Sequence, residues 1–188
     1  MHLTTPRIPP LGPDQWNDEQ AQTVAPMGER PVLNIFRTML HNPQALRAFL
    51  SWGNYVLSKR NSLPAREREI AILRVGYLCR SGYEWTQHRP IGERAGLTAS
   101  EIEAIKLGAD SPVWSEADRA LLRGCDELHQ RQFISDATWQ ALGAHFDQRQ
   151  CMDLVFTVGQ YTQVSMLLNT FGVQLDEGQV LDPDLQAY

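Results

Sequence analysis

The 188-residue sequence lacks several features that would place it in a well-marked class. No apolar run approaches the roughly 20 residues that a membrane helix needs, so we expect no membrane span. Lysine and arginine form no run, and the formal net charge of −5 argues against nucleic acid as a partner, since nucleic-acid binding needs a basic face. The first residues show no cationic region followed by an apolar stretch. We therefore expect no secretory signal and a cytoplasmic protein.

Cysteines and cofactor motifs are also scarce. The three cysteines, Cys79, Cys125 and Cys151, are odd in number, widely spaced and form no C-x-x-C pair. This pattern argues against a disulfide framework, a zinc knuckle or a dithiol redox motif, and favours small buried hydrophobes. No phosphate loop, dinucleotide fingerprint or cofactor lysine motif is present, so no cofactor is expected. A metal site at Glu84 and His88 would need further ligands, and none is expected.

What is present is helical periodicity within a single domain, with no alternating pattern of strands. Residues 1–31 are rich in proline and predict an extended arm with one short helix over 14–23, either mobile or packed on a neighbouring subunit. Residues 32–176 predict an all-α helical bundle, and residues 177–188 a loose polar tail. Helix starts are marked by Asn42 before Pro43, Thr98 with Glu101, Ser115 with Asp118, and Ser135.

The segment that follows Pro64 becomes apolar on all sides, from Ile70 to Cys79, and predicts a helix buried on most faces. Gly82 is suited to the left-handed turn that ends it. Ser81 has the position and spacing to cap the next helix, over residues 83–95, because Glu84 lies three residues further on.

The densest group of functional side chains is Ser81-Gly-Tyr-Glu-Trp-Thr-Gln-His88. Glu84 and His88 are four residues apart and share one helix face, an arrangement suited to proton transfer. They also fit a surface pair worth a few tenths of a kcal/mol, and Glu84 alone fits a capping acid. Glu69 fits an acid that complements a helix dipole. Sequence spacing does not bring it to His88 unless the next helix returns antiparallel.

A second polar group interrupts the apolar helix expected over 149–171. It includes Gln160 and Tyr161. Buried polar groups need partners. These side chains therefore either satisfy one another in the core or line a pocket.

Several segments together resemble the carboxymuconolactone decarboxylase family. They are Leu63-Pro-Ala-Arg-Glu-Arg-Glu-Ile-Ala-Ile-Leu-Arg-Val, Tyr83-Glu-Trp-Thr-Gln-His88, Ala95-Gly-Leu-Thr, Leu154-Val-Phe-Thr-Val-Gly-Gln-Tyr161 and Leu168-Asn-Thr-Phe171. The resemblance covers residues 34–176. It implies an all-helical fold of the alkylhydroperoxidase D-like type and assembly as a homotrimer or homohexamer.

The resemblance also implies two activities, decarboxylation of a lactone acid and peroxide reduction by Glu…Cys-x-x-Cys-x-x-x-His. His88 and Glu69 match the histidine and glutamate of that motif, while Ser81 and Glu84 stand where the two cysteines would be. Without both thiols a dithiol peroxidase cannot operate. Cys79, two residues from the first matched position, is a poor substitute.

The leading hypothesis is a cofactor-independent acid/base enzyme of the decarboxylase, isomerase or dehydratase type, acting on a small organic acid or lactone. Its catalytic residues are His88, Glu84 and Glu69. Its expected substrate-binding residues are Tyr83, Trp85, Ser81 and Tyr161. The alternatives are an alkylhydroperoxidase or peroxiredoxin-like antioxidant protein that uses Cys79, and a non-catalytic oligomeric binding protein.

Overall fold

Helix α4 (Ala65–Leu78) runs through the middle of the computed structural model, which describes residues 3–186. Ile70, Ile72 and Leu73 have no exposed surface, as expected of a helix that is apolar on all sides. It packs against α5 (Gly82–Arg94), α6 (Ala99–Leu107), α7 (Glu116–Arg131) and α9 (Gln148–Phe171). The predicted burial of this segment on most faces is confirmed.

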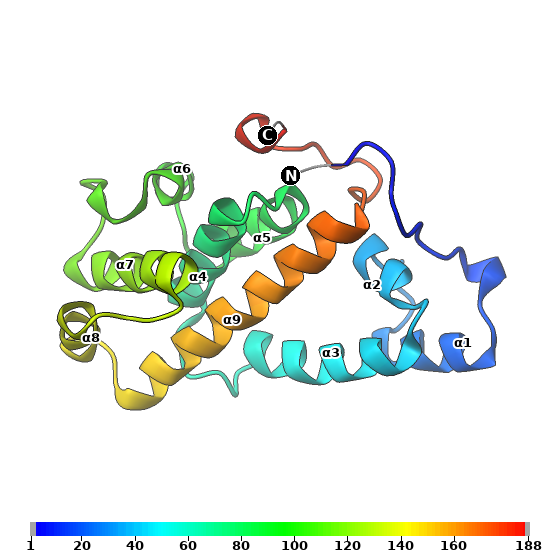
Figure 1. Cartoon of the computed structure of the whole chain (residues 1–188), viewed down its shortest axis with the longest axis horizontal. Coiled ribbons are helices and arrows are strands. Elements are labelled where there is room, and N and C mark those ends of the chain that lie inside the picture. Colours follow the sequence, from blue (N-terminus) through cyan, green and yellow to red (C-terminus); the bar gives the residue numbers. More distant parts are fainter. Residues whose placement is uncertain (1–2, 187–188) are drawn as a thin grey trace.

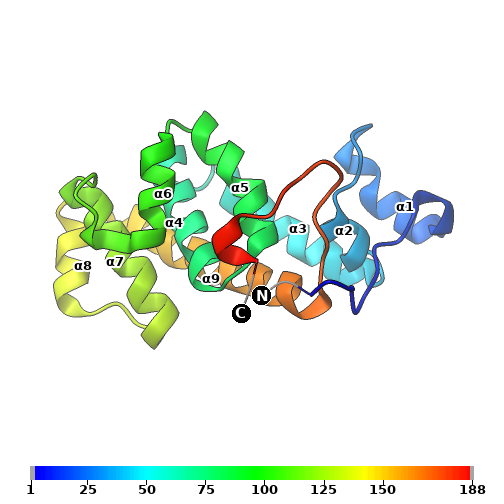
Figure 2. The same cartoon turned by 90° about the horizontal axis from the view of Figure 1, so that it is seen from above.

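The remaining helices are arranged around α4 in two groups, and α9 runs diagonally past both (Figure 1). One end of the molecule holds α1 (Asp18–Val24), α2 (Asn34–Met39) and α3 (Pro43–Leu57). The other end holds α6, α7 and α8 (Asp136–Gly143), as Figure 2 also shows. Residues 3–186 contain no strand, so the predicted all-α class is confirmed.

Predicted capping residues start several of these helices. The Asn42 side chain accepts a hydrogen bond from the Ala45 amide at 3.1 Å, and Pro43 occupies the first helical position of α3. Thr98, Ser115 and Ser135 likewise accept hydrogen bonds from backbone amides in the first turns of α6, α7 and α8. Local sequence therefore determines where these helices begin.

The described part of the N-terminal arm, from residue 3, packs on its own chain, which the sequence did not indicate. The Arg7 amide donates to the Phe171 carbonyl at 2.8 Å, and Gln174 donates to the Leu3 carbonyl at 2.7 Å. Further along, Val24 packs with Leu40 and Leu46 in a small second core. The arm is thus fixed against α2, α3 and the end of α9.

The C-terminal tail is also held in place, so the expectation of a loose tail is wrong for residues 177–186; residues 187 and 188 lie outside the described part. Leu185 is buried, and the Lys106 ammonium forms ion pairs with Asp182 at 3.0 Å and Asp184 at 2.8 Å. Leu181 lies so close to Gly82 that a Cβ on Gly82 would clash with it.

The left-handed turn between α4 and α5 falls on Arg80, at φ 52°, and not on Gly82 as predicted.

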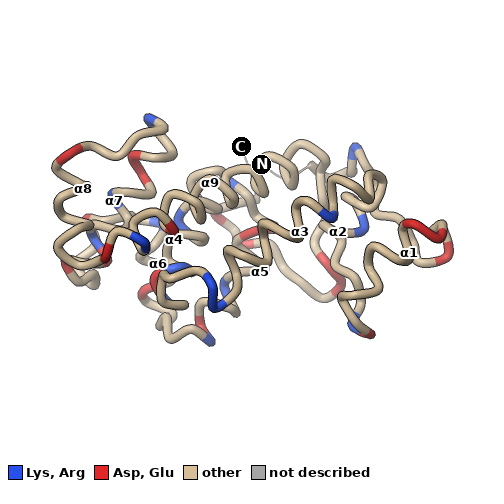
Figure 3. The backbone as a smooth tube through the Cα atoms, turned by 90° about the horizontal axis from the view of Figure 1, so that it is seen from below, with Lys and Arg blue, Asp and Glu red and all other residues tan. Residues whose placement is uncertain are grey.

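Acidic and basic residues are interspersed along the chain, as the tube in Figure 3 shows. Neither sign dominates one end of the part drawn in colour. Among residues 3–186, no helix is long and apolar enough to cross a membrane.

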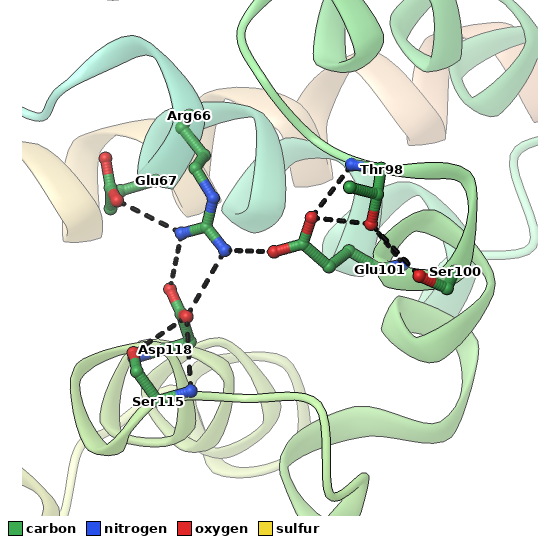
Figure 4. Close-up of polar contacts among 7 residues, drawn as sticks. All are labelled: Arg66, Glu67, Thr98, Ser100, Glu101, Ser115 and Asp118. Carbon is green, nitrogen blue, oxygen red and sulfur yellow. Dashed lines mark hydrogen bonds and ion pairs between the residues drawn. The ribbon is translucent and has the colours of Figure 1, made fainter.

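One group of charges joins three helices on the side of α4 that faces α6 and α7 (Figure 4). In this Arg66 cluster, the guanidinium of Arg66 contacts Glu101 at 2.5 Å, Asp118 at 2.8 Å and Glu67 at 3.2 Å. Glu101 also accepts hydrogen bonds from Thr98 at 2.8 Å, and Asp118 accepts one from Ser115 at 2.8 Å. The carboxylates of Glu101 and Asp118 therefore have a cation and further donors as partners.

Candidate active site

Helices α4 and α5 pack side by side and bring Glu69 to His88. Their chain reversal at Arg80–Gly82 lets α5 return along α4, the geometry that sequence spacing alone could not establish. Gly76 on α4 makes this approach possible, because a Cβ there would lie 2.9 Å from Cγ of Glu84. Glycine at this position leaves room for the Glu84 side chain between the two helices.

The central contact of the site is a hydrogen bond between His88 and Glu69. His88 Nδ1 donates to Glu69 Oε2 at 2.7 Å, and both residues are buried. This partner assigns the proton to Nδ1 of the neutral ring and leaves Nε2 as its basic nitrogen. Nε2 lies 3.8 Å from Oε1 of Glu84. We call Glu69, Glu84 and His88 the His88 cluster.

Glu84 lies inside the protein rather than at the helix surface. Only 2% of it is exposed, and no described residue donates a hydrogen bond to its Oε1. Burial, and then the negative charge of Glu69, raise the pKa of Glu84 well above its ordinary 4.5. The expected capping box with Ser81 does not form, because Glu84 turns inward and Ser81 makes no side-chain cap. Glu84 therefore favours the neutral acid beside the charged Glu69.

Tyr161 on α9 completes the polar end of the site. Its ring meets that of His88 edge to face, with centroids 4.9 Å apart and planes at 87°. Burial raises the pKa of Tyr161 well above 10.0, so it remains a phenol. No hydrogen bond from the described part of the chain engages its hydroxyl. Tyr161 is thus an available donor next to His88.

These side chains open into a cavity of about 200 Å³ between α2, α3, α5 and α9. Its polar lining includes the buried residues Glu84, His88, Gln160 and Tyr161. Its apolar lining comes mainly from α2, α3 and α9: Ile35, Phe36, Phe49, Leu50, Leu57, Val164 and Leu168. An apolar cavity with a few convergent polar groups is the usual form of a small-molecule site.

The predicted site residues divide into two sets. Tyr83 lines the cavity, but its hydroxyl already donates to Asp176 at 2.7 Å, so it is engaged in structure. Trp85 is fully buried and does not line the cavity; it packs against Tyr77 and Lys106 on another face of α5. Ser81 is also buried and outside the lining, because it precedes the first turn of α5. The structure thus places Trp85 and Ser81 outside the cavity.

Several lining residues carried no sequence signal for a site. The apolar wall from α2 and α3 looks like ordinary core, and Gly53 and Asn54 have no motif around them. Asp176 lies 93 residues from Tyr83 and also accepts hydrogen bonds from Gln87 and from the Asn34 amide. Only the tertiary structure brings these elements together.

Cys79 lies outside this cavity. Its sulfur is 3.7 Å from Nδ1 of His129, beside a separate hollow that includes Thr162 and Asn169. Burial raises the pKa of its thiol above 9.0, which disfavours the thiolate. Within residues 3–186, no group of three or more histidine, cysteine, aspartate or glutamate side chains could hold a metal ion.

Comparisons with known proteins agree with this fold. Residues 43–127 match the model of the carboxymuconolactone decarboxylase family. None of the curated protein sequences matches the chain significantly.

Three solved structures have folds similar to that of this chain, at low sequence identity to it. An alkylhydroperoxidase AhpD core from Ralstonia eutropha, described as an uncharacterised peroxidase-related protein, is 19% identical, with a TM-score of 0.80 over 92% of this chain and 93% of that chain. The debrominase Bmp8, in complex with 2,3,4-tribromopyrrole, is 14% identical, with a TM-score of 0.72 over 94% and 95%. A protein of unknown function from Agrobacterium tumefaciens is 22% identical, with a TM-score of 0.68 over 73% and 94%.

At these identities the structures show the fold alone, while the family model covers the segment that holds Glu69, Glu84 and His88. Residues 43–127 therefore match the carboxymuconolactone decarboxylase family model, and the fold of the chain is similar to alkylhydroperoxidase D-like structures.

Proposed function

We propose that the protein is an acid/base enzyme of the lyase or isomerase type that moves a proton on a small carbonyl compound without a cofactor. The observation that carries this proposal is the His88 cluster, in which a histidine with a carboxylate partner lies 3.8 Å from a second carboxyl, whose pKa is raised by burial. Pairs of titratable groups whose surroundings drive their pKa values apart are typical of acid and base partners.

In this mechanism His88 Nε2 is the general base. It removes a proton from the carbon next to the substrate carbonyl, and the C–H electron pair moves to form the enolate. The Glu69 carboxylate, 2.7 Å from Nδ1, stabilises the imidazolium that results. The proton then returns from Nε2 to carbon, at the same or a neighbouring position, which completes an exchange or an isomerisation.

Glu84 supplies the acid. Its separation from Nε2 exceeds hydrogen-bond length, so the two groups can contact different atoms of one substrate. As a neutral carboxyl it donates a hydrogen bond to the oxygen that becomes negative in the enolate. Tyr161 and Gln160, which line the same cavity, are further donors for that oxygen.

Proton exchange with deuterated water tests this proposal. Purified protein is incubated in D₂O with a panel of small ketones, lactones and organic acids, and deuterium at the carbon next to the carbonyl is followed by NMR. We expect catalysed exchange that is lost in His88→Gln and kept in the control His145→Gln, which changes an exposed histidine. Undiminished exchange in His88→Gln would refute the proposal.

A peroxidase that uses Cys79 is the second candidate. The contact between Cys79 and His129 favours it, because an imidazole can accept the thiol proton. The raised pKa of the thiol and its position outside the main cavity count against it. A peroxide-consumption assay decides the matter, since activity that disappears in Cys79→Ser would favour the peroxidase.

A further inference from the structure

We infer that the cavity selects an uncharged, mainly apolar carbonyl compound and rejects carboxylic acids. This inference rests on the proposed function. Among the small ketones, lactones and organic acids considered as substrates, it favours the uncharged ones, such as a ketone or a lactone without an acid group. The charges, the shape and the free hydrogen-bond donors of the cavity all favour such a ligand.

The described lining of the cavity carries no cation that could pair with a bound carboxylate. None of the described residues that line the cavity is a lysine or an arginine, whereas the Glu69 carboxylate lies directly behind His88. A bound carboxylate would lose its hydration and meet a negative charge without a cation in contact with it. Arg68 is close enough to lower the pKa of Tyr161 slightly, but its side chain does not line the cavity.

The volume of the cavity limits the size of the ligand. The volume of about 200 Å³ exceeds the roughly 150 Å³ of an engineered apolar cavity that binds benzene, so one ring with a short substituent fits. Phe36, Phe49 and Leu50 supply an apolar wall for that ring. Gly53 borders the same space, and a Cβ built on it would meet no atom closer than Nε2 of Gln160, at 3.9 Å.

Free hydrogen-bond donors on the lining mark the position for a carbonyl oxygen. The Gln160 side chain is buried, and no described residue accepts a hydrogen bond from its Nε2. The Tyr161 hydroxyl and the neutral Glu84 carboxyl are further donors on the same lining. Because a buried donor without an acceptor is costly, a ligand oxygen at this point gains affinity. One carbonyl oxygen meets these donors without adding a charge.

Binding of a matched pair of ligands tests the inference. Phenylacetone and phenylacetate share a ring, a methylene group and a carbonyl. Phenylacetone carries a methyl group where phenylacetate carries a charged oxygen. Binding is measured by isothermal titration calorimetry at pH 7 on the full-length protein. We expect phenylacetone to bind at least about 10-fold more tightly than phenylacetate, and this preference to persist in Arg68→Gln.

Two variants check that binding occurs in this cavity. Gly53→Leu should weaken phenylacetone at least about 10-fold by filling the space, while circular dichroism shows an unchanged or higher Tm, because leucine favours a helix more than glycine does. Asn54→Arg places a cation on the lining and should improve the affinity for phenylacetate.

The inference is overturned if phenylacetate binds as tightly as phenylacetone, if phenylacetone does not bind, or if Gly53→Leu leaves its binding unchanged. The proposed function fails separately. Selective binding of phenylacetone without deuterium exchange on any member of the panel would refute the enzyme and retain the ligand class. Exchange confined to organic acids would refute the ligand class and retain the enzyme.

Discussion

The Arg66 cluster and the His88 cluster both begin on α4, three residues apart, yet their carboxyl groups differ in the partners that they have and in the direction of their pKa shifts. In the Arg66 cluster the guanidinium lies between three carboxylates, and two of them, Glu101 and Asp118, also accept hydrogen bonds from capping residues (Figure 4). In the His88 cluster one histidine is hydrogen-bonded to one carboxylate, and neither Oε1 of Glu69 nor Oε1 of Glu84 has a hydrogen-bond partner among residues 3–186.

The pKa directions record this difference. Burial acts to raise the pKa of Glu101, but hydrogen bonds from Thr98 and Arg66 outweigh it and leave the pKa lowered from 4.5. Burial and the charge of Glu69 raise the pKa of Glu84, and no partner offsets them. A satisfied network stabilises the fold, whereas buried polar atoms without partners cost stability and are expected where a ligand binds.

The largest effect is expected from breaking the His88 cluster. In His88→Gln the rate of deuterium exchange into a turned-over substrate should fall by about 10²- to 10⁴-fold, the usual contribution of a general base. Exchange rates by NMR, with circular dichroism to confirm folding, provide the measurement. A variant that retains its rate would show that the cluster is merely structural.

Breaking the Arg66 cluster should act on stability instead. Arg66→Met leaves Asp118 and Glu101 without their cation and should lower the free energy of unfolding by about 3 kcal/mol. Urea unfolding measures this change, and the exchange rate per folded molecule should stay within about twofold. Arg89→Met, which removes an exposed ion pair with Glu93, is the matched control and should cost less than about 1 kcal/mol.

Removing the acid of Glu84 should stabilise the protein. A pKa raised on folding means that the folded state holds this proton more tightly than the unfolded chain does, so its contribution is full below pH 4.5 and is lost as the pH rises through the raised pKa. Glu84→Gln cannot ionise, so its free energy of unfolding should rise relative to that of the wild type as the pH rises. The difference should reach about 1 kcal/mol at pH 8. An equal difference at pH 5 and pH 8 would contradict a raised pKa.

The smallest effect is expected at Glu101, with the opposite sign. Its lowered pKa gives stability that is present above pH 4.5 and is lost as the pH falls through the folded-state value. Glu101→Gln should lower stability by up to about 1 kcal/mol at pH 7 and by less at pH 3. Urea unfolding at both pH values checks this, and a difference that grows toward low pH would count against it.

Sequence reasoning predicted most of the fold, because the signals were local. Asn42 with Pro43, and Thr98 with Glu101, mark helix starts by hydrogen bonds that span three residues. Burial of α4 at Ile70, Ile72 and Leu73 follows from the apolar run that begins at Ile70. The arm and the tail were predicted less well, because their partners, such as Phe171 for Arg7 and Lys106 for Asp182, are distant in sequence.

For the site, the chemistry was easier to predict than the surroundings. The resemblance supplied Glu69 and His88, and the return of α5 brings them into contact. Spacing favoured Glu84 as a capping acid at Ser81, but the space beside Gly76 holds its side chain inside instead. Trp85 looked like a pocket wall because it is a neighbour in sequence, yet successive residues of a helix point about 100° apart.

The protonation state of Glu84 tests the central claim most directly, since it requires no substrate. Infrared spectra of the wild type and of Glu84→Gln at pH 7 are subtracted to isolate the carboxyl of this one residue, with the exposed Glu93→Gln as the control. We predict the carbonyl-stretch band of a neutral carboxyl for Glu84, which is lost only at high pH, and a carboxylate band for Glu93. A carboxylate band for Glu84 at pH 7 would contradict the assignment of Glu84 as the acid of this site.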